Sequence, residues 1–352
     1  MKNKQKIKLK NTRITYLDIL NVIAIIAVIA LHCNGIVHGN PNTRAWNTSL
    51  IVECICYFAV PLFCMLSGAT LMNYREKYDT KTFFKKRFIK VLVPFAFWAI
   101  IMFIWKIHII KTIPNINGLK NWINAFFQNK EESTYYFMYS ILGIYLTLPI
   151  LSLLTEKKHR KTLWFTVVLY FIFNSLIPNV LNLFEITYNT NTQVLLGGYI
   201  IFVILGYLLS TEELSRNKRI IIYIFAIIGV LYRFFTTYIM SKEYGYVIKT
   251  TWGYTSWHSI LLASSVFIFI KQLFTVKISL SAKKAKLVSK ISSCSFGIYL
   301  IHQIVMYYEK TIFSINTASW EWRTMGVIIT YIISLIIVFS MKKIPIVKKL
   351  VP

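Results

Sequence analysis

Long apolar runs alternate with short polar connections along almost the entire chain. The runs are roughly 17 to 25 residues long, which is enough for an α-helix to cross a hydrocarbon core about 30 Å thick. The pattern therefore predicts an all-α, polytopic membrane protein with about ten transmembrane helices. We expect these helices at 15–37, 50–73, 89–110, 134–154, 162–180, 194–211, 219–240, 255–275, 291–309 and 324–341.

Lysine and arginine residues are distributed unevenly between the two sets of connections. Of the 40 basic residues, 30 lie in one set, nine lie in the opposite set, and Arg233 lies inside a predicted span. Because cytoplasmic loops carry an excess of Lys and Arg, the first set is predicted to face the cytoplasm, together with both termini. This basic set comprises 2–13, 74–90, 155–161, 212–219, 271–290 and 342–349.

The chain is predicted to form one transmembrane domain over 1–352. Residues 1–14 and 342–352 are expected to be basic cytoplasmic tails. The first apolar run follows a basic segment and has no small-residue cleavage site, so we expect no removable signal peptide. The two longest connections, 111–133 and 178–193, are predicted to lie on the outer side and to frame a vestibule.

Composition agrees with a membrane environment, since 56% of the 352 residues are hydrophobic, 15% are charged, and the mean hydropathy is +0.56. A net charge of +27 would suggest nucleic acid as the partner of a soluble protein. Here the basic residues lie between apolar runs, so we expect contacts with membrane lipids and no nucleic-acid binding. The five cysteines lie in or beside apolar runs, without the spacing of a disulfide frame or a zinc site, and no metal is expected.

Two ionisable residues lie near the outer ends of the first two predicted spans. His32 is about 21 Å beyond Asp18 along the first helix, and its neutral imidazole can act as a general base in acyl transfer. Glu53 begins the second span at a similar depth, where its carboxylate would orient the imidazole. The alternative interpretation is that both side chains simply reach the outer interface.

A basic cluster follows the second span and comprises Lys85, Lys86, Arg87 and Lys90. Arg and Lys supply charge-assisted hydrogen bonds to phosphate oxygens, so the cluster could hold the phosphates of a nucleotide-bearing donor. Within the span, the small residues Ser67 and Gly68 would allow helix backbones to approach closely. Ser67 is also expected to contact the donor, together with Lys86, Arg87 and Lys90. Ordinary orientation-setting charge is the alternative explanation of the cluster.

Three further polar residues are predicted to lie within the membrane. Tyr299 and His302 are three residues apart on one face of the ninth predicted helix, and His302 is near its middle. Arg233 in the seventh helix could stabilise a developing oxyanion or pair with a carboxylate of a neighbouring helix. Insertion of such groups costs roughly 2.5 to 3.5 kcal/mol each, so we interpret all three as candidate site residues.

Six segments, in this order, resemble motifs of the acyltransferase 3 family of membrane O-acyltransferases, which modify sugars of bacterial cell-surface glycans. Together they extend over nearly the whole chain. They are YLDILNVIAIIAVIALH (16–32), FAVPLFCMLSGATLM (58–72), FFKKRFIKVLVPFAFW (83–98), ILGIYLTLPIL (141–151), GYIIFVILGYLLS (198–210) and SFGIYLIHQIV (295–305).

This resemblance implies a ten-helix enzyme of the bacterial cytoplasmic membrane. It would transfer an acetyl or other short acyl group from acyl-CoA, usually acetyl-CoA, to a hydroxyl of a surface glycan or its lipid-linked precursor. His32 matches the family's first-helix histidine, but the arginine expected eleven residues earlier is replaced by Asn21. Asn21 would then act on the donor through hydrogen bonds, or Arg87 would supply the missing cation.

Two other functional classes fit the same pattern of spans. A transporter or flippase for a lipid-linked saccharide would also have about ten helices with buried polar groups. Against it, hydropathy contains no inverted repeat and no pair of Gly/Pro-broken helices in matching halves. A non-catalytic scaffold of a glycan-assembly complex is the third class, and it would tolerate loss of His32.

Overall fold

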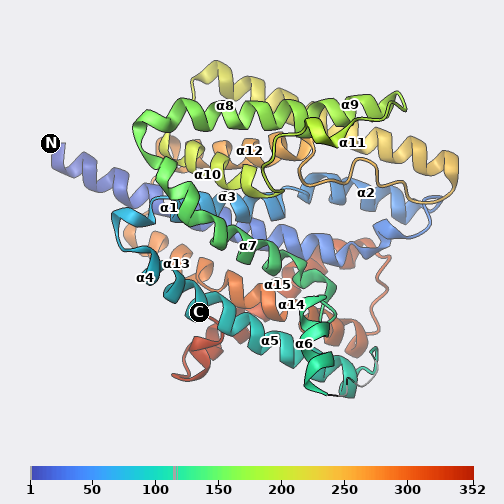
Figure 1. Ribbon diagram of the computed structural model, residues 1–352. Helices are drawn as coiled ribbons and strands as arrows, with labels where there is room; N and C mark the ends of the chain where they lie inside the picture. Colours follow the sequence, from blue (N-terminus) through green and yellow to red (C-terminus); the bar gives the residue numbers. More distant parts are fainter. Residues whose placement is uncertain (1, 114–115, 117) are drawn as a thin grey trace.

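The computed structural model is a bundle of helices whose long members run roughly alongside one another (Figure 1). It describes residues 2–113, 116 and 118–352, and side chains from residue 15 onward. Within these residues every regular element is helical, which confirms the predicted all-α fold. The predicted basic tail, 1–14, lies outside the residues whose side chains are described.

The helices follow the chain in two groups. The first half contains α1 (Lys2–Cys33), α2 (Arg44–Cys56), α3 (Ala59–Leu71), α4 (Thr80–Arg87), α5 (Val93–Ile104), α6 (Leu119–Phe127), α7 (Tyr136–Leu151) and α8 (Arg160–Tyr170). The second half contains α9 (Ile177–Leu183), α10 (Ile200–Thr211), α11 (Arg216–Tyr244), α12 (Trp257–Gln272), α13 (Ala282–Ser292), α14 (Ser295–Ile312) and α15 (Val327–Met341).

Eight helical segments of the described chain are long and apolar enough to cross a membrane. The other two predicted spans are present as α10, which has only 12 residues, and α14, which has 18 residues and carries His302, Gln303, Glu309 and Lys310. The total of ten spans therefore stays a prediction. The eight segments are Thr15–Cys33, Arg44–Glu76, Thr80–Ile109, Ser133–Thr155, Lys157–Leu183, Arg216–Tyr244, Trp257–Lys277 and Trp322–Met341.

Helices α3 and α10 are in backbone contact through one glycine on each. A Cβ atom on Gly68 would lie 1.9 Å from the carbonyl oxygen of Val203, and a Cβ on Gly206 would lie 1.9 Å from that of Met65. Both distances are far below any real contact of a side-chain carbon. Small residues thus let this helix pair pack closely, as predicted for Gly68.

Helix α1 runs through the middle of the bundle and packs against α3, α12, α13, α14 and α15 (Figure 1). Its residues Tyr16, Leu20 and Ala24 recur at intervals of four and are fully buried. By contrast, α11 buries only a narrow stripe and exposes many Ile and Phe side chains. Helix α1 is therefore part of the core, whereas α11 presents most of its surface to the surroundings.

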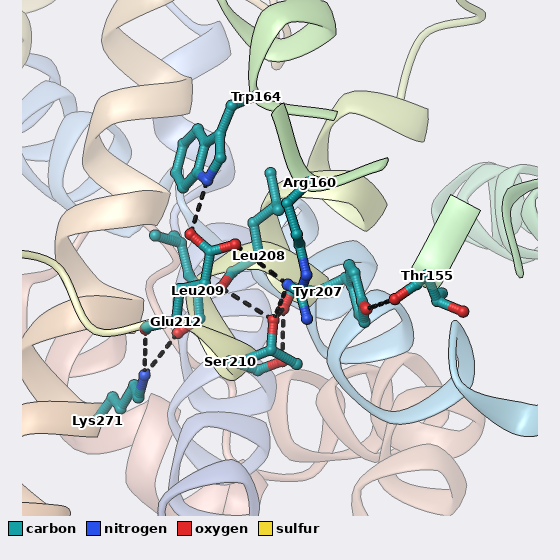
Figure 2. A network of polar contacts seen from close by, with 10 residues as sticks. Thr155, Arg160, Trp164, Tyr207, Leu208, Leu209, Ser210, Glu212 and Lys271 are labelled. Carbon is teal, nitrogen blue, oxygen red and sulfur yellow. Dashed lines mark hydrogen bonds and ion pairs between the residues drawn. The ribbon is translucent and has the colours of Figure 1, made fainter. Parts of the chain in front are cut away.

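A polar network joins α8, α10 and α12 where α10 ends (Figure 2). Glu212 pairs with Arg160 at 3.2 Å and accepts a hydrogen bond of 2.8 Å from Trp164 Nε1. Lys271 Nζ donates to the carbonyl oxygens of Leu209 and Glu212 at 2.8 and 2.7 Å. The ammonium group thus satisfies carbonyls that the last turn of a helix leaves without partners.

The predicted grouping of loops agrees with contacts at the two ends of the bundle. The network above brings together residues from 155–161, 212–219 and 271–290, and Lys342 donates to Ser293 O at 2.6 Å. We call this the basic end. At the opposite end, Lys106 pairs with Glu132 at 2.9 Å and Arg323 donates to Thr48 Oγ1 at 2.8 Å.

Candidate functional site

Two histidines that are 270 positions apart in sequence face each other. His32 is in the last turn of α1, His302 lies in α14, and their ring centroids are 5.2 Å apart with an angle of 30° between the planes. His32 is partly buried, whereas His302 is completely buried. The structure thus places in one site two histidines that the sequence presented separately.

The tautomer of His302 is set by its own helix. Its Nδ1 lies 2.7 Å from the backbone oxygen of Tyr299. Because a carbonyl oxygen can only accept, Nδ1 carries the proton and Nε2 retains a lone pair. A neutral imidazole in this form can take up a proton at Nε2, as general-base chemistry requires.

Tyr299 lies beside this pair, with its ring centroid 5.9 Å from that of His302. Its hydroxyl donates a hydrogen bond of 2.5 Å to the backbone oxygen of Thr134. In return, Tyr135 donates a hydrogen bond of 2.5 Å to the backbone oxygen of Leu300. The hydroxyl of this candidate site residue is therefore engaged in holding the segment before α7 against α14.

Glu53 and Arg233 pair with each other rather than with the histidines. Arg233 Nη2 lies 3.3 Å from Glu53 Oε1, and the two residues are 1% and 5% exposed. The guanidinium carbon also lies 3.3 Å from the centroid of the Tyr57 ring. This corrects the expected pairing of Glu53 with His32, because a buried guanidinium needs a compensating carboxylate more than a neutral imidazole does. For Arg233, the alternative of pairing with a neighbouring helix is the one observed.

A cavity of about 420 Å³ opens between α1, α3, α7, α13 and α14, with the end of α4 and the turn at 88–92 on its wall. Four of the five residues expected to bind the donor line it, namely Asn21, Ser67, Arg87 and Lys90. The cavity also reaches Tyr299, which is in contact with His302. Its other lining residues are Asp18, Phe63, Val91, Phe137, Met138, Ile141, Tyr145, Ser289, Ser292, Ser293, Ser295, Phe296 and Pro352.

Neighbouring residues of the basic cluster point in different directions, because they lie on different faces of one helical turn. The guanidinium of Arg87 lies against the rings of Phe83 and Tyr145, at 5.8 and 5.6 Å from their centroids, on the cavity wall. Lys86 points elsewhere, because its ammonium group lies 3.8 Å above the ring of Tyr78. Lys86 does not line the cavity, and so the expectation that it contacts the donor is not supported by its position.

Asn21 holds α1 to α13 at the basic end of this cavity. Its side-chain amide donates to both the backbone oxygen and the hydroxyl of Ser292, each at 2.9 Å. Cations on the cavity wall are supplied instead by Arg87 and Lys90. The position where related sequences are expected to have arginine thus has a helix-bridging role in this chain.

Sequence analysis missed one charged pair near the histidines. Glu132 is buried and pairs with Lys106 at 2.9 Å, on a segment that Tyr299 of α14 holds through the backbone oxygen of Thr134. Acidic residues are rare in this chain, 13 in all, and Glu132 directly precedes a predicted span. That placement was the available signal, but the contact with α14 depends on how the loop folds back.

Comparison with protein families gives one match, an acyltransferase domain that is aligned over residues 14–339. Comparisons with curated proteins and with solved structures give no match. The matched range includes α1, which carries His32, the helices that line the cavity, and α14, which carries His302. From residue 14 to residue 339, the chain is a member of the acyltransferase 3 family of membrane proteins.

Proposed function

We propose that this membrane acyltransferase transfers an acetyl or other short acyl group from acyl-CoA to a hydroxyl of a cell-surface glycan or its lipid-linked precursor. The cavity is the observation that carries the proposal. It extends from Arg87 and Lys90 to Tyr299, and Tyr299 contacts His302, which faces His32. A donor held there would place its phosphates and its thioester at opposite ends of one space.

The cavity lining has the chemistry of such a donor. Arg87 and Lys90 at one end can form charge-assisted hydrogen bonds with phosphates. The wall beyond them is apolar and aromatic, with Phe63, Phe137 and Ile141, and suits a pantetheine arm and a short acyl chain. Since these cations lie at the basic end, the donor would enter from the cytoplasm of a bacterial cell.

The proposed chemistry uses His32 as the general base. His32 accepts the proton of the acceptor hydroxyl, and the hydroxyl oxygen forms a bond with the carbonyl carbon of the thioester. The carbon–sulfur bond then breaks, and the CoA sulfur takes up the proton from the imidazolium. The ring of His302 is held by its Nδ1–H bond to the backbone oxygen of Tyr299. It packs against the ring of His32 and thereby helps to orient it. Because His32 is in the last turn of α1, the acceptor is expected at the opposite end from the basic cluster.

Donor binding is tested by comparing neighbouring cations. We expect Arg87→Ala and Lys90→Ala each to raise the KM for acetyl-CoA about tenfold, because hydrogen bonds to charged groups contribute about 1.5 to 3 kcal/mol. Lys86→Ala is the matched control, since it removes an adjacent cation that does not line the cavity. An equal rise for all three variants would indicate a general charge effect and contradict the donor site.

Acyl transfer is tested with His32→Ala in cells. The variant should insert and fold normally, and surface glycans should lose the acetyl mass increment that wild-type cells have. Retention of full acetylation would exclude His32 from the mechanism. Movement of a lipid-linked saccharide across vesicles without any acyl donor would instead favour a flippase, and unchanged glycans in cells lacking the protein would favour a scaffold.

A further inference from the structure

The segment immediately before α7, residues 131–135, lies across α14 at the level of the histidines. Two hydrogen bonds of 2.5 Å hold it there, from Tyr299 to the oxygen of Thr134 and from Tyr135 to the oxygen of Leu300. Thus the 131–135 segment and residues 299–302 of α14 form one locally crosslinked unit. Charged groups on the segment are fixed relative to His302.

Glu132 is the acidic residue of this segment that has an ion-pair partner. It is 8% exposed, and its Oε1 accepts a hydrogen bond of 3.2 Å from the backbone nitrogen of Thr134. Its other oxygen pairs with Lys106 at 2.9 Å. The same Thr134 accepts the hydrogen bond of the Tyr299 hydroxyl at its carbonyl oxygen, and Tyr299 lies one helical turn before His302. Both oxygens of Glu132 are therefore held by the protein, so that its charge has a fixed position near the imidazoles.

The preceding residue provides a natural comparison. Glu131 is completely buried and accepts a hydrogen bond of 2.8 Å from Tyr139, while its Oε2 has no partner within the described residues. Burial raises the pKa of Glu131 above its usual range. No ion pair involving Glu131 is formed within the described part of the chain, whereas Glu132 has its cation. Of the two neighbouring glutamates, the one paired with a cation is thus Glu132.

We propose that Glu132, held in place by Lys106, is a positioning residue whose negative charge stabilises the imidazolium formed by the histidine pair during acyl transfer. The inference rests on the proposed function, and it gives the pair the carboxylate that Glu53 does not supply. In many hydrolases a fixed carboxylate performs this task for a single histidine. Here the carboxylate comes from a loop beside α14 instead of from the neighbouring helix α2.

The test uses membrane vesicles, labelled acetyl-CoA and base-treated surface polysaccharide from the same cells. Glu132→Gln keeps the shape and the acceptor for the Thr134 N–H but removes the charge. We expect its kcat to fall at least about tenfold with the KM for acetyl-CoA unchanged. Glu132→Asp, which retains the charge, should recover part of the lost kcat.

Glu131→Gln is the matched control, because it makes the same chemical change one residue away. We expect it to retain wild-type kcat. Wild-type kcat in Glu132→Gln, or an equal loss in Glu131→Gln, would overturn the role of Glu132. If wild-type vesicles transfer no acyl group to any acceptor, the proposed function itself fails, and the two failures are therefore distinguishable.

Discussion

Asn21 on α1 donates two hydrogen bonds of 2.9 Å to one residue of α13, Ser292. The pair joins helices whose sequences are about 270 positions apart, at the basic end of the cavity. A side chain that was expected to contact the donor is therefore observed to join two walls of the cavity. Substitution of Asn21 therefore measures how much this bridge contributes to stability.

We expect Asn21→Ala to lower the free energy of unfolding by about 1 to 3 kcal/mol, because each hydrogen bond contributes about 0.5 to 1.5 kcal/mol. Thermal unfolding in detergent measures this loss. Asn21→Asp keeps the size of the side chain but replaces the amide donor, so it should be destabilised as well. Wild-type stability of both variants would show that the bridge to Ser292 contributes little.

Close contact between α3 and α10 predicts a strong effect of single methyl groups. In Gly206→Ala the new carbon would lie 1.9 Å from the oxygen of Met65, so the helices must separate. We expect destabilisation of at least about 1 to 3 kcal/mol, the usual cost of overpacking a core. The measurement is the yield of monodisperse protein and its unfolding temperature. Gly143→Ala, where nothing lies within 4 Å, is the control and should fold normally.

The buried pair of Arg233 and Glu53 predicts a non-additive result. Arg233→Met leaves a carboxylate buried without its cation, and removal of one partner of such a pair typically costs about 3 to 5 kcal/mol. We expect Arg233→Met combined with Glu53→Gln to recover most of that loss. A double-mutant cycle on unfolding temperature checks the prediction, which additive effects of the two changes would contradict.

Glu131 predicts how stability depends on pH. Burial is the largest cause of its raised pKa, so folding favours the protonated carboxyl. The stability that this proton contributes is present below the unfolded pKa and is lost as the pH rises through the folded pKa. Relative to wild type, Glu131→Gln should therefore become more stable as the pH increases from about 4 toward neutrality. The measurement is the unfolding temperature of wild type and of Glu131→Gln at each pH. Parallel curves for the two proteins would contradict the prediction.

Much of the fold could be predicted from hydropathy, because membrane spans are long and nearly uncharged. Eight of the predicted spans correspond to long apolar helices in the structure. The pattern could not predict the irregular turns at 88–92, 105–109 and 171–176, where the helices are locally widened. Hydropathy measures only how apolar a segment is, and it does not report whether a helical turn is widened.

For the candidate site, residue types were easier to predict than partners. His32 and His302 were both recognised as unusual within an apolar helix, but their contact depends on how α1 packs against α14. Glu53 was expected beside His32 because consecutive helices are usually neighbours. Its partner instead comes from α11, since the buried charge of Arg233 requires compensation.

Helix α10 has 12 residues, a length of about 18 Å, and every residue from Ile201 to Ser210 is buried. The helix is enclosed by protein and has almost no contact with lipid tails. A thicker or thinner bilayer would therefore tilt or strain helices of the periphery such as α11, while α10 would stay matched to its neighbours. We therefore expect the contact between α3 and α10 at their glycines to stay unchanged when the lipid composition changes.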